Sequence, residues 1–429
     1  MMSADAGATE VLIVGAGPAG LSAAAAAAEC GKQVVVLDLG MRPGGQIWRH
    51  RDVATLPRAA RNLLDRARRA GVVIRSGARV IDAISPNELI VEHGGGAHRI
   101  ETDALVIATG ARERMLPFPG WTLPGVVGIG GLQALVKNGL SLSGSRVVVA
   151  GTGPLLLPVA ASAADAGARV LIVAEQATRG ALARFAAGLL RKPAAIGQAM
   201  RYRWAFRRAP FRTDSWVTAA EGSDRLRAVT LSERGRKKAF DCDWLATGMG
   251  LVPGIEFAQL LGCRIDEGAI DVDESQSSSI PGVWAAGECT GVKGDAAAIA
   301  EGEIAGRAAA GDRSLPPPRQ VLRQRDDGRV FGRRLAATFA PRKELLDLAT
   351  ADTIVCRCED VRRGAIDPRW TQRQAKLWTR IGMGECQGAV CGPACAALFG
   401  WETNAPRPPL GAPRCGDWAD ALAESRAER

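Results

Sequence analysis

The chain opens with apolar runs arranged around a glycine-rich turn. Residues 11–14 are four consecutive apolar residues, which predict a buried strand of a parallel sheet. The turn of residues 15–20 follows directly, and the alanine-rich stretch after it predicts a helix that ends at Gly31. A second predicted strand, residues 33–37, finishes on Asp38. Strand, turn, helix and strand in this order predict a βαβ unit and therefore an α/β fold.

The turn has the G-x-G-x-x-G spacing of a dinucleotide-binding site. The first glycine permits the tight turn, the second leaves room for a pyrophosphate, and the third lets the helix pack against the strand. A proline at the first helical position costs little, because its missing N–H has no partner there. An acid about 20 residues further on accepts the ribose hydroxyls. A glycine turn without a ligand is the alternative. The residues predicted to hold the nucleotide are Gly15, Gly17, Pro18, Ala19, Gly20 and Asp38.

A second copy of this pattern lies in the middle of the chain. The predicted strand 146–150 leads into the turn 151–156, and a later strand ends on Glu175, an acid that favours NAD over NADP. Leu156 stands at the third glycine position, and Pro158 crowds the first helical turn, so both distort the pyrophosphate site. The alternatives are NAD(P), another nucleotide, or a structural role alone. The candidate residues of this second site are Gly151, Gly153, Pro154 and Glu175.

Composition and charge exclude several classes of function. The chain has 429 residues, 47% of them hydrophobic and 23% charged, which is typical of a soluble protein of several domains. No apolar run approaches the ~18 residues that span a bilayer, and no basic segment precedes the first strand, so we predict a cytoplasmic protein. The net charge is +10, and arginines mix with aromatic residues in 201–208. Without a nucleic-acid motif this cluster predicts a solvated face or a subunit contact.

Cysteine is distributed unevenly, and histidine is scarce. Only three histidines occur, which disfavours histidine-based acid–base chemistry. Six of the ten cysteines lie beyond residue 355, and such clustering in a cytoplasmic protein indicates a metal site. The cluster combines C-x-C at Cys356 and Cys358 with C-x4-C at Cys386 and Cys391. Four thiolates suit a [2Fe–2S] cluster or a tetrahedral zinc ion equally well.

Three segments resemble the flavoproteins with two dinucleotide-binding domains, the thioredoxin reductase and glutathione reductase superfamily. The first is the opening βαβ unit, the second is Thr109-Gly110-Ala111 after an apolar strand, and the third is Gly287-Glu288, where aspartate is usual. The resemblance implies FAD in the first domain, with Gly45 and Gln46 close to it, and a nicotinamide nucleotide in the second. The redox cysteine pair of the disulfide reductases is missing, which excludes thiol–disulfide exchange.

Two further residues are candidates for a position near the flavin. Lys293 precedes an alanine-rich helix whose N-terminus stabilises negative charge on a reduced flavin in this superfamily. His50 is a candidate proton donor in the loop after the first βαβ unit. The alternatives are a solvent-facing lysine and a histidine that only supports its loop.

The carboxyl-terminal pattern C-R-C-E-x-V … G-M-G-x-C-Q-G-x-x-C is similar to the [2Fe–2S] domain of the bacterioferritin-associated-ferredoxin type. This resemblance implies a small α-helical domain in which Cys356, Cys358, Cys386 and Cys391 bind the cluster, with zinc as the alternative. The predicted fold is therefore α/β with two Rossmann-like domains and a helical [2Fe–2S] domain. The expected domains are FAD-binding (1–120 and 251–312), NAD(P)-binding-like (121–250), linker (313–350), [2Fe–2S] (351–402) and tail (403–429).

Together these features resemble the α (A or B) subunits of heteromeric, dye-linked amino- and imino-acid dehydrogenases. The group includes D-hydroxyproline dehydrogenase, opine oxidase, cyanide-forming glycine dehydrogenase and archaeal proline dehydrogenase. The resemblance implies an oxidoreductase acting on CH–NH or CH–NH2 donors of the opine, D-hydroxyproline, proline or glycine type. A β subunit similar to D-amino-acid oxidase oxidises the amine in this family, and the α subunit carries electrons onward, in a cytoplasmic or membrane-associated complex.

The resemblance also implies a small ferredoxin-like γ subunit. Some members of the group bind FMN at the interface between subunits, so the resemblance also implies FMN as a further cofactor. We expect no nucleic-acid partner, because no binding motif accompanies the arginine cluster at 201–208. The alternatives are a self-contained NAD(P)H-dependent ferredoxin or acceptor reductase, and an assembly subunit with empty sites.

Overall fold

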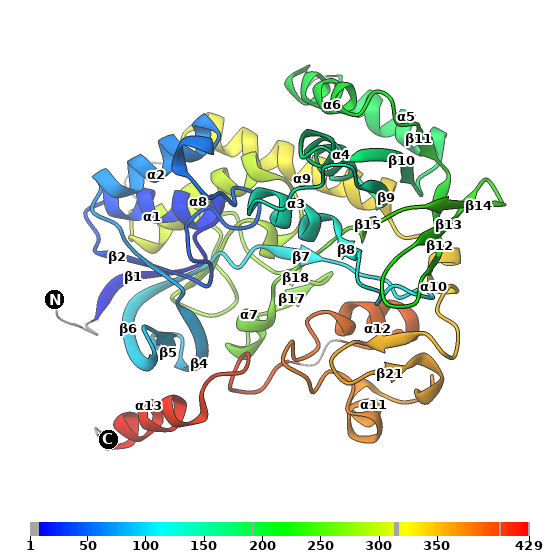
Figure 1. The fold of residues 1–429 in the computed structure, drawn as a ribbon. Helices are drawn as coiled ribbons and strands as arrows, with labels where there is room; N and C mark the ends of the chain where they lie inside the picture. The colour runs from blue at the N-terminus through cyan, green and yellow to red at the C-terminus, as the bar shows by residue number, and fades with distance from the viewer. Residues whose placement is uncertain (1–7, 191–192, 313–316, 403–404, 428–429) are drawn as a thin grey trace. The chain divides into compact units, whose positions relative to one another are not determined.

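The computed structural model describes residues 8–190, 193–312, 317–402 and 405–427, and the chain divides into two compact units (Figure 1). Unit 1 comprises Met1–Arg112, Val252–Gly332 and Ala405–Arg429. Unit 2 comprises Glu113–Leu251 and Arg333–Asn404. The division runs through helix α9 (Arg319–Phe339), so the region expected as a linker carries a long helix. The first residues of that expected linker, 313–316, lie outside the described residues.

Unit 1 is built on a seven-stranded sheet whose first strands are parallel. Its order is β3-β2-β1-β6-β5-β4, and β19 pairs with β6. Strands β1, β2, β3, β6 and β19 run parallel, whereas β4 and β5 continue antiparallel from β6. The bounds are β1 Thr9–Val14, β2 Val34–Asp38, β3 Val73–Ser76, β4 Arg79–Ser85, β5 Glu88–His93, β6 Gly96–Ile107 and β19 Val283–Ala285.

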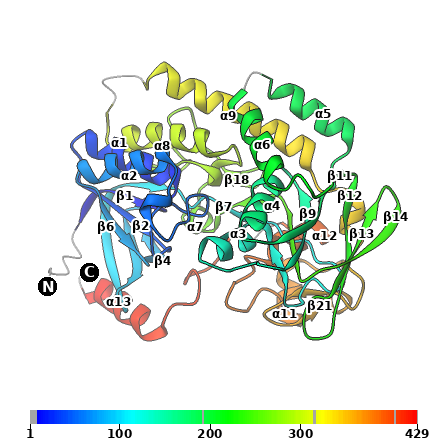
Figure 2. The same ribbon diagram turned by 45° about the horizontal axis from the view of Figure 1, so that its top comes forward.

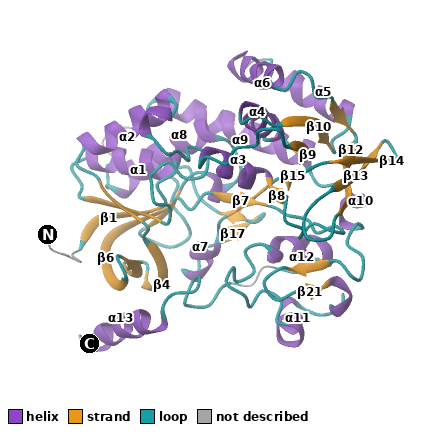
Figure 3. Ribbon diagram, in the orientation of Figure 1, coloured by secondary structure: helices purple, strands orange, loops and turns teal. Residues whose placement is uncertain are grey.

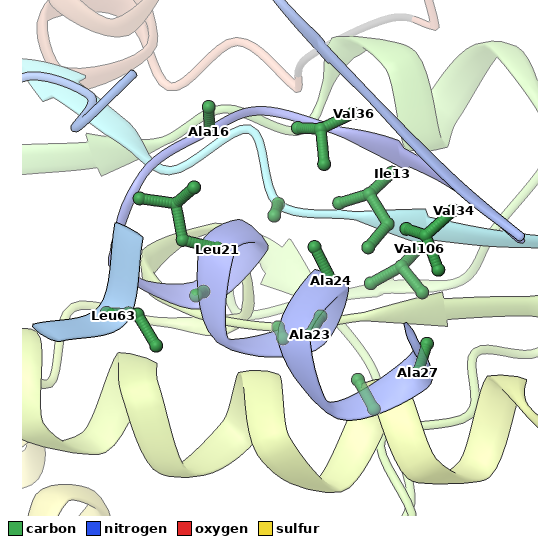
Figure 4. Packing of buried hydrophobic residues seen from close by; sticks show 14 of the residues in the cluster. Ile13, Ala16, Leu21, Ala23, Ala24, Ala27, Val34, Val36, Leu63 and Val106 are labelled. Atoms are coloured by element: carbon green, nitrogen blue, oxygen red, sulfur yellow. The ribbon is translucent and has the colours of Figure 1, made fainter. Parts of the chain in front are cut away.

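Helices α1 (Pro18–Glu29), α2 (Arg58–Arg69) and α8 (Asp295–Ala309) cover one face of this sheet (Figure 1). Ile13, Val36 and Val106 point into this layer together with the alanines of α1 (Figure 4). Neighbouring strand residues such as Leu12 and Leu105 belong to the core on the opposite face. Burial of both faces explains why these strands are apolar at nearly every position.

The remaining elements of unit 1 are short, apart from its last helix. Helix α13 (Cys415–Ala427) lies in the segment expected as a tail, beside the antiparallel strands of the sheet (Figure 2), and its Ala421 packs with Ile81 and Ile90. Residues 403–404 of that tail lie outside the described residues. The short elements are η1 Val53–Thr55, α7 Glu256–Leu260, β17 Ile265–Asp266, β18 Ala269–Ile270 and η2 Glu288–Thr290, and β7 Ala111–Glu113 and β16 Leu251–Pro253 lie at the division.

Unit 2 repeats the parallel βαβ architecture in five strands. Its sheet has the order β11-β10-β9-β15-β8, with every pair parallel. Helices α3 and α4 cover one face, and the antiparallel sheet β12-β13-β14 packs on the other (Figure 3). The bounds are β8 Val126–Gly128, α3 Ile129–Lys137, β9 Arg146–Thr152, α4 Leu156–Asp165, β10 Arg169–Glu175, α5 Arg179–Gly188, α6 Pro193–Ala205, β11 Phe211–Thr213, β12 Ser215–Glu221, β13 Ala228–Glu233, β14 Arg236–Asp241 and β15 Trp244–Met249.

The cysteine-rich part of unit 2, here called the cysteine domain (residues 354–399), combines a small hairpin with two helices. Its own core includes Val355, Ile366 and Ala375. Trp121 donates a hydrogen bond from Nε1 to the carbonyl oxygen of Ile354 (2.6 Å), which joins this domain to the rest of unit 2. The bounds are α10 Lys343–Leu346, β20 Ile354–Cys356, β21 Val361–Arg362, η3 Arg363–Ala365, α11 Gln372–Thr379 and α12 Cys391–Phe399.

Candidate functional site

The glycine turn of unit 1 connects β1 to α1. Gly15 has a φ of +111°, and a Cβ there would lie 2.3 Å from the carbonyl oxygen of Ala108. A Cβ on Gly20 would lie 1.8 Å from the carbonyl oxygen of Gly15. A Cβ on Gly17 would meet no heavy atom within 4 Å. The turn therefore packs tightly at its first and third glycines and leaves open space at the second, beside the first turn of α1, where Pro18 is the first helical residue.

Asp38 ends β2 beside this turn. Its carboxylate accepts hydrogen bonds from the backbone N–H of Ala16 (2.5 Å) and of Gly40 (2.6 Å). Burial raises the pKa of Asp38 above its usual value, although both hydrogen bonds oppose the shift. These contacts fix the Asp38 carboxylate beside the glycine turn.

The loop after β2 presents an apolar surface. Three of its large side chains are exposed by 63%, 80% and 49%: Leu39, Met41 and Ile47. In the same loop, a Cβ on Gly45 would lie 3.0 Å from the Cα of Gly17, so the loop lies beside the backbone of Gly17 and leaves the position of a side chain there open. The side chain of Gln46 is exposed and accepts a hydrogen bond from Arg49 (2.9 Å).

His50 is buried within this loop, with 8% of its surface exposed. Its Nδ1 lies 2.9 Å from the carbonyl oxygen of Trp48. A carbonyl oxygen only accepts hydrogen bonds, so Nδ1 carries a hydrogen atom and donates a hydrogen bond to Trp48. The contact gives His50 a role in supporting its loop, and its role as a proton donor stays a prediction.

The two later segments predicted from the sequence lie at the same crevice. Gly15 lies against Ala108, the residue before Thr109, and the Thr109 hydroxyl donates a hydrogen bond to the carbonyl oxygen of Gly254 (2.5 Å). A Cβ on Gly287 would lie 2.7 Å from the Cβ of Ala19, so the third segment packs against the first turn of α1. The structure thus gathers the three segments around the start of α1.

The second and third segments also contain Gly110, which has a left-handed backbone conformation, and Glu288, whose carboxyl group is buried. Gly110 has a φ of +70°, and Ala111 begins β7 directly after it. Burial raises the pKa of Glu288, the nearby carboxylate of Asp295 adds to the shift, and a hydrogen bond from the N–H of Gly294 opposes it. Glu288 therefore places a buried carboxyl group at the start of η2, and its contact with FAD stays a prediction.

Lys293 forms an ion pair with Glu301 that the sequence did not predict. Its ammonium contacts the carboxylate of Glu301, which is completely buried, and donates to the hydroxyl of Thr290 (3.0 Å). The other oxygen of Glu301 accepts hydrogen bonds from the N–H of Gly287 and from Thr290, both at 3.0 Å. The pair therefore fixes the turn that follows β19. The one sequence signal was an acid within an alanine-rich helix, where a charge needs a partner.

The glycine turn of unit 2 differs from that of unit 1 in the position at which its helix begins. Helix α4 begins at Leu156, two residues later than the position at which α1 begins in unit 1, where Pro154 corresponds to Pro18. This delay agrees with the distortion expected from Leu156 and Pro158. A Cβ on Gly151 would lie 2.1 Å from the carbonyl oxygen of Gly248, so this first glycine still serves tight packing.

Glu175 is almost completely buried, with 1% of its surface exposed. Its carboxylate accepts hydrogen bonds from the N–H of Gly153 (2.8 Å), the N–H of Ala177 (2.9 Å) and the hydroxyl of Thr152 (3.0 Å). Burial raises the pKa of Glu175 to about 7, against the opposing effect of these bonds. Glu175, the residue predicted to bind a ribose, is therefore already hydrogen-bonded to other residues of the chain.

The four predicted cluster ligands lie in the cysteine domain as two pairs. The sulfur atoms of Cys358 and Cys386 are 3.7 Å apart. Burial raises the pKa of Cys391, and the neighbouring thiol of Cys356 adds to that shift. A Cβ on Gly384 would lie 2.3 Å from the Cβ of Cys358, so only glycine allows this approach. Within the described ranges, no group of three or more histidine, cysteine or acidic side chains is arranged to hold a metal ion.

Backbone N–H groups gather around one of these sulfur atoms. Burial tends to raise the pKa of Cys386, but the N–H groups of Val390, Gly388 and Ala389 bond to it and bring its pKa below the ordinary value. The thiol of Cys358 contributes to the same lowering. Donors of this kind stabilise a thiolate and reduce the charge that an iron–sulfur site must carry.

The sequence profile of the pyridine nucleotide-disulphide oxidoreductase family matches residues 9–306. The chain belongs to this family, and membership implies that it is an oxidoreductase that binds FAD. The predicted α/β fold with Rossmann-like domains is thereby confirmed. No helix in the described parts of the chain is long and apolar enough to cross a membrane.

Within this family the chain belongs with components of multi-subunit enzymes, as the sequence predicts. It is 32% identical over 427 residues to the HcnB subunit of hydrogen cyanide synthase from Pseudomonas aeruginosa, covering 89% of this chain and 90% of that protein. It is 32% identical over 426 residues to the A-type subunit of opine oxidase from Rhizobium meliloti, covering 89% and 80%. The L-proline dehydrogenase structure from P. horikoshii matches 96% of this chain and 79% of that chain, with a TM-score of 0.67 and 17% identity, which indicates the same fold.

Proposed function

We propose that this chain is the electron-transfer subunit of a heteromeric dehydrogenase that oxidises a secondary amine or an imino acid. In this proposal a partner subunit oxidises the substrate at its own flavin, and this chain carries the electrons onward through FAD and a [2Fe–2S] cluster. The observation that carries the proposal is the combination, in one chain, of a glycine turn with open space at its second glycine in unit 1 and four paired cysteines in unit 2.

The residues of unit 1 fit FAD. Open space at Gly17 beside the N-terminus of α1 suits a pyrophosphate, and the carboxylate of Asp38 suits the ribose hydroxyls. The exposed apolar side chains after β2 suit the adenine ring. Glu288 replaces the aspartate that holds the ribityl chain in related proteins. Bound FAD supplies the redox chemistry, and the chain's residues bind it and orient it.

Lys293 and Glu301 act here as positioning residues. Their ion pair holds the turn of Gly287 and Thr290, from which α8 begins. The partial positive charge at the N-terminus of α8 then faces a fixed site and favours negative charge on a reduced flavin. The assignment of these contacts to FAD is part of the proposal.

The cysteine domain fits a [2Fe–2S] cluster in its donor set. Two thiol pairs supply the four thiolates of such a cluster, and the N–H groups around Cys386 favour the thiolate form. We propose Cys356, Cys358, Cys386 and Cys391 as the ligands. Tetrahedral zinc would use the same four thiolates, so metal analysis has to distinguish the two.

The partner in this proposal is a β subunit similar to D-amino-acid oxidase. Further components are a small ferredoxin-like γ subunit, and FMN bound where subunits meet. The relatives that carry the argument are named as components of hydrogen cyanide synthase and opine oxidase. The substrate would be of the opine, D-hydroxyproline, proline or glycine type, and the complex would be cytoplasmic. Its electron acceptor could tie it to a membrane.

A second candidate is a self-contained NAD(P)H-dependent acceptor reductase. The observation that favours it is the second βαβ unit with its Gly151–Gly153 turn. It predicts reduction of the flavin by NADH without any partner.

The test is expression of the chain by itself and together with its β and γ partner subunits. We expect the isolated chain to contain FAD and two iron atoms and to leave proline, D-hydroxyproline, octopine, nopaline, sarcosine and glycine unoxidised. We expect the complex to reduce a dye with one of these amines. A colourless chain, zinc in place of iron, or amine oxidation by the isolated chain would contradict the proposal.

A further inference from the structure

The segment at the end of α9, residues 339–342, lies against the carboxyl edge of the parallel sheet of unit 2. We call it the crevice segment. The carbonyl oxygen of Phe339 lies 3.4 Å from the hydroxyl oxygen of Thr152, at the end of β9. The carbonyl oxygen of Ala340 accepts a hydrogen bond from Nε2 of Gln176 (2.9 Å), which follows β10. The segment therefore contacts the glycine turn and the residue after Glu175 at once.

Arg342 extends these contacts to the third strand. Its guanidinium pairs with the carboxylate of Asp214 (2.5 Å), directly after β11, and donates to the carbonyl oxygen of Gln176 (3.3 Å). Its backbone N–H donates to Oε1 of Gln176 (3.2 Å). The ends of β9, β10 and β11 form the edge at which doubly wound sheets bind the adenosine half of a dinucleotide. The crevice segment contacts all three.

Unit 1 shows what the same position looks like when it is open. Leu39 follows the acid of unit 1 and is 63% exposed, whereas Gln176 follows the acid of unit 2 and is 3% exposed. A ligand could cover Leu39, but in unit 2 this area is already covered by the chain. Glu175, with 1% of its surface exposed, has no free face for a ribose hydroxyl.

The crevice segment is anchored from outside the crevice as well. The ring of Phe339 packs edge-on against Phe185 of α5, with ring centres 5.0 Å apart. The guanidinium of Arg342 stacks over Trp216 at 4.2 Å. Displacement of the segment by a nucleotide would break these contacts in addition to the hydrogen bonds.

The segment leads directly into the support of the cysteine domain. Leu345, three residues further on, is 1% exposed and packs with Leu116, Trp216 and Met249. The chain then reaches Ile354, which Trp121 holds by its hydrogen bond. The same stretch therefore covers the nucleotide crevice and ties the cysteine domain to unit 2.

We infer that the crevice segment replaces the adenosine half of a nicotinamide dinucleotide, so unit 2 accepts no NAD(P)H and electrons enter this chain only from its partner subunit. This inference rests on the proposed function, because it specifies the electron donor of the proposed electron-transfer subunit. In this inference the rest of unit 2 serves to support the cysteine domain.

The test uses the purified complex under anaerobic conditions. Millimolar NADH or NADPH is added, and the visible flavin absorbance is followed beside a sample that receives the amine substrate. We expect reduction by the amine and a rate with NADH below about one hundredth of it. Reduction by NADH at a comparable rate overturns the inference and leaves the proposed function standing. Failure of the amine to reduce the flavin contradicts the proposed function, and the NADH result still decides this inference.

Hydrogen exchange on the same complex tests the segment itself. We expect millimolar NAD+ to leave amide exchange in residues 151–156 and 339–342 unchanged. Slower exchange in 151–156 with NAD+ overturns the inference. In Arg342→Ala we expect exchange at 339–342 to accelerate about fivefold or more, and in the control Lys343→Ala, an exposed neighbour, we expect no change. An unchanged rate in Arg342→Ala contradicts the anchoring, and Phe339→Leu provides a milder variant if that protein does not fold.

Discussion

Units 1 and 2 begin from the same design, a parallel strand, a glycine turn, a helix and a second strand that ends on an acid, yet they differ at the turn. In unit 1 the second glycine faces open space, and the side chain after the acid is exposed. In unit 2 the helix starts late, the acid is saturated by hydrogen bonds, and the chain's own segment covers the crevice. These differences underlie our proposal that unit 1 rather than unit 2 binds a dinucleotide.

The difference teaches that a βαβ unit can keep its packing role after its crevice is filled. Gly15 and Gly151 both allow a backbone approach that a Cβ would prevent, at 2.3 Å and 2.1 Å. This requirement belongs to the fold, so it persists in both units. The requirement for open space at the second glycine belongs to the ligand. Variants that separate these two requirements therefore test the comparison.

The largest effect is expected from a substitution in the cysteine domain of unit 2. Cys386→Ser removes a thiolate that the N–H groups of Val390, Gly388 and Ala389 stabilise. We expect loss of the cluster and a fall in dye reduction by the complex of more than about 100-fold, because even outer-shell changes cost up to that factor. Iron analysis and the visible spectrum are the measurements. Cys415→Ser, at an exposed cysteine of unit 1, is the control and should keep its iron.

The next effect concerns the open position of unit 1. Gly17→Val places a side chain where the pyrophosphate would bind, while its Cβ meets no heavy atom within 4 Å and its φ of −75° suits valine. We expect FAD affinity to fall by about 100-fold, or ~2.7 kcal/mol, with little change in the melting temperature of the FAD-free protein. Flavin content after purification and reconstitution titrations measure it. Retention of a full complement of FAD would remove unit 1 as the flavin site.

A smaller effect is expected at the acid of unit 2. The pKa of Glu175 is raised from 4.5 to about 7, so between these pH values the folded state binds more protons than the unfolded state. The unfolding free energy should therefore fall as pH rises from 4.5 to 7, by about 3 kcal/mol from this group.

Glu175→Gln removes this titration and should flatten the dependence. Urea unfolding of the wild type and the variant across this pH range is the measurement, with the exposed Asp347→Asn as the control. A slope that survives in Glu175→Gln would show that another group is responsible.

The smallest effect is expected from Arg342→Ala. The variant loses a partly exposed ion pair with Asp214 and the stacking on Trp216, which together stabilise unit 2 by about 1 kcal/mol. Urea unfolding measures the change, and Lys343→Ala should stay within about 0.5 kcal/mol of the wild type. Equal stability of both variants would indicate that Arg342 does not hold the crevice segment in place.

The sequence alone determined the strands, the glycine turns and the closing acids of both βαβ units. These features depend on local patterns, such as apolar runs, glycine spacing and an acid at the end of a strand, and the structure places them as expected. It also indicated that Leu156 and Pro158 would disturb the second helix, because both effects act within one helical turn.

Only the tertiary structure decided what lies next to these local features. The pairing of Lys293 with Glu301 joins residues on either side of a turn, and the crevice segment meets residues more than 120 positions away in the sequence, such as Asp214. No periodicity or spacing records such contacts, because they depend on how helices and sheets pack. The local chain therefore specified the two glycine turns, and long-range packing decided that the crevice segment lies against the turn of unit 2.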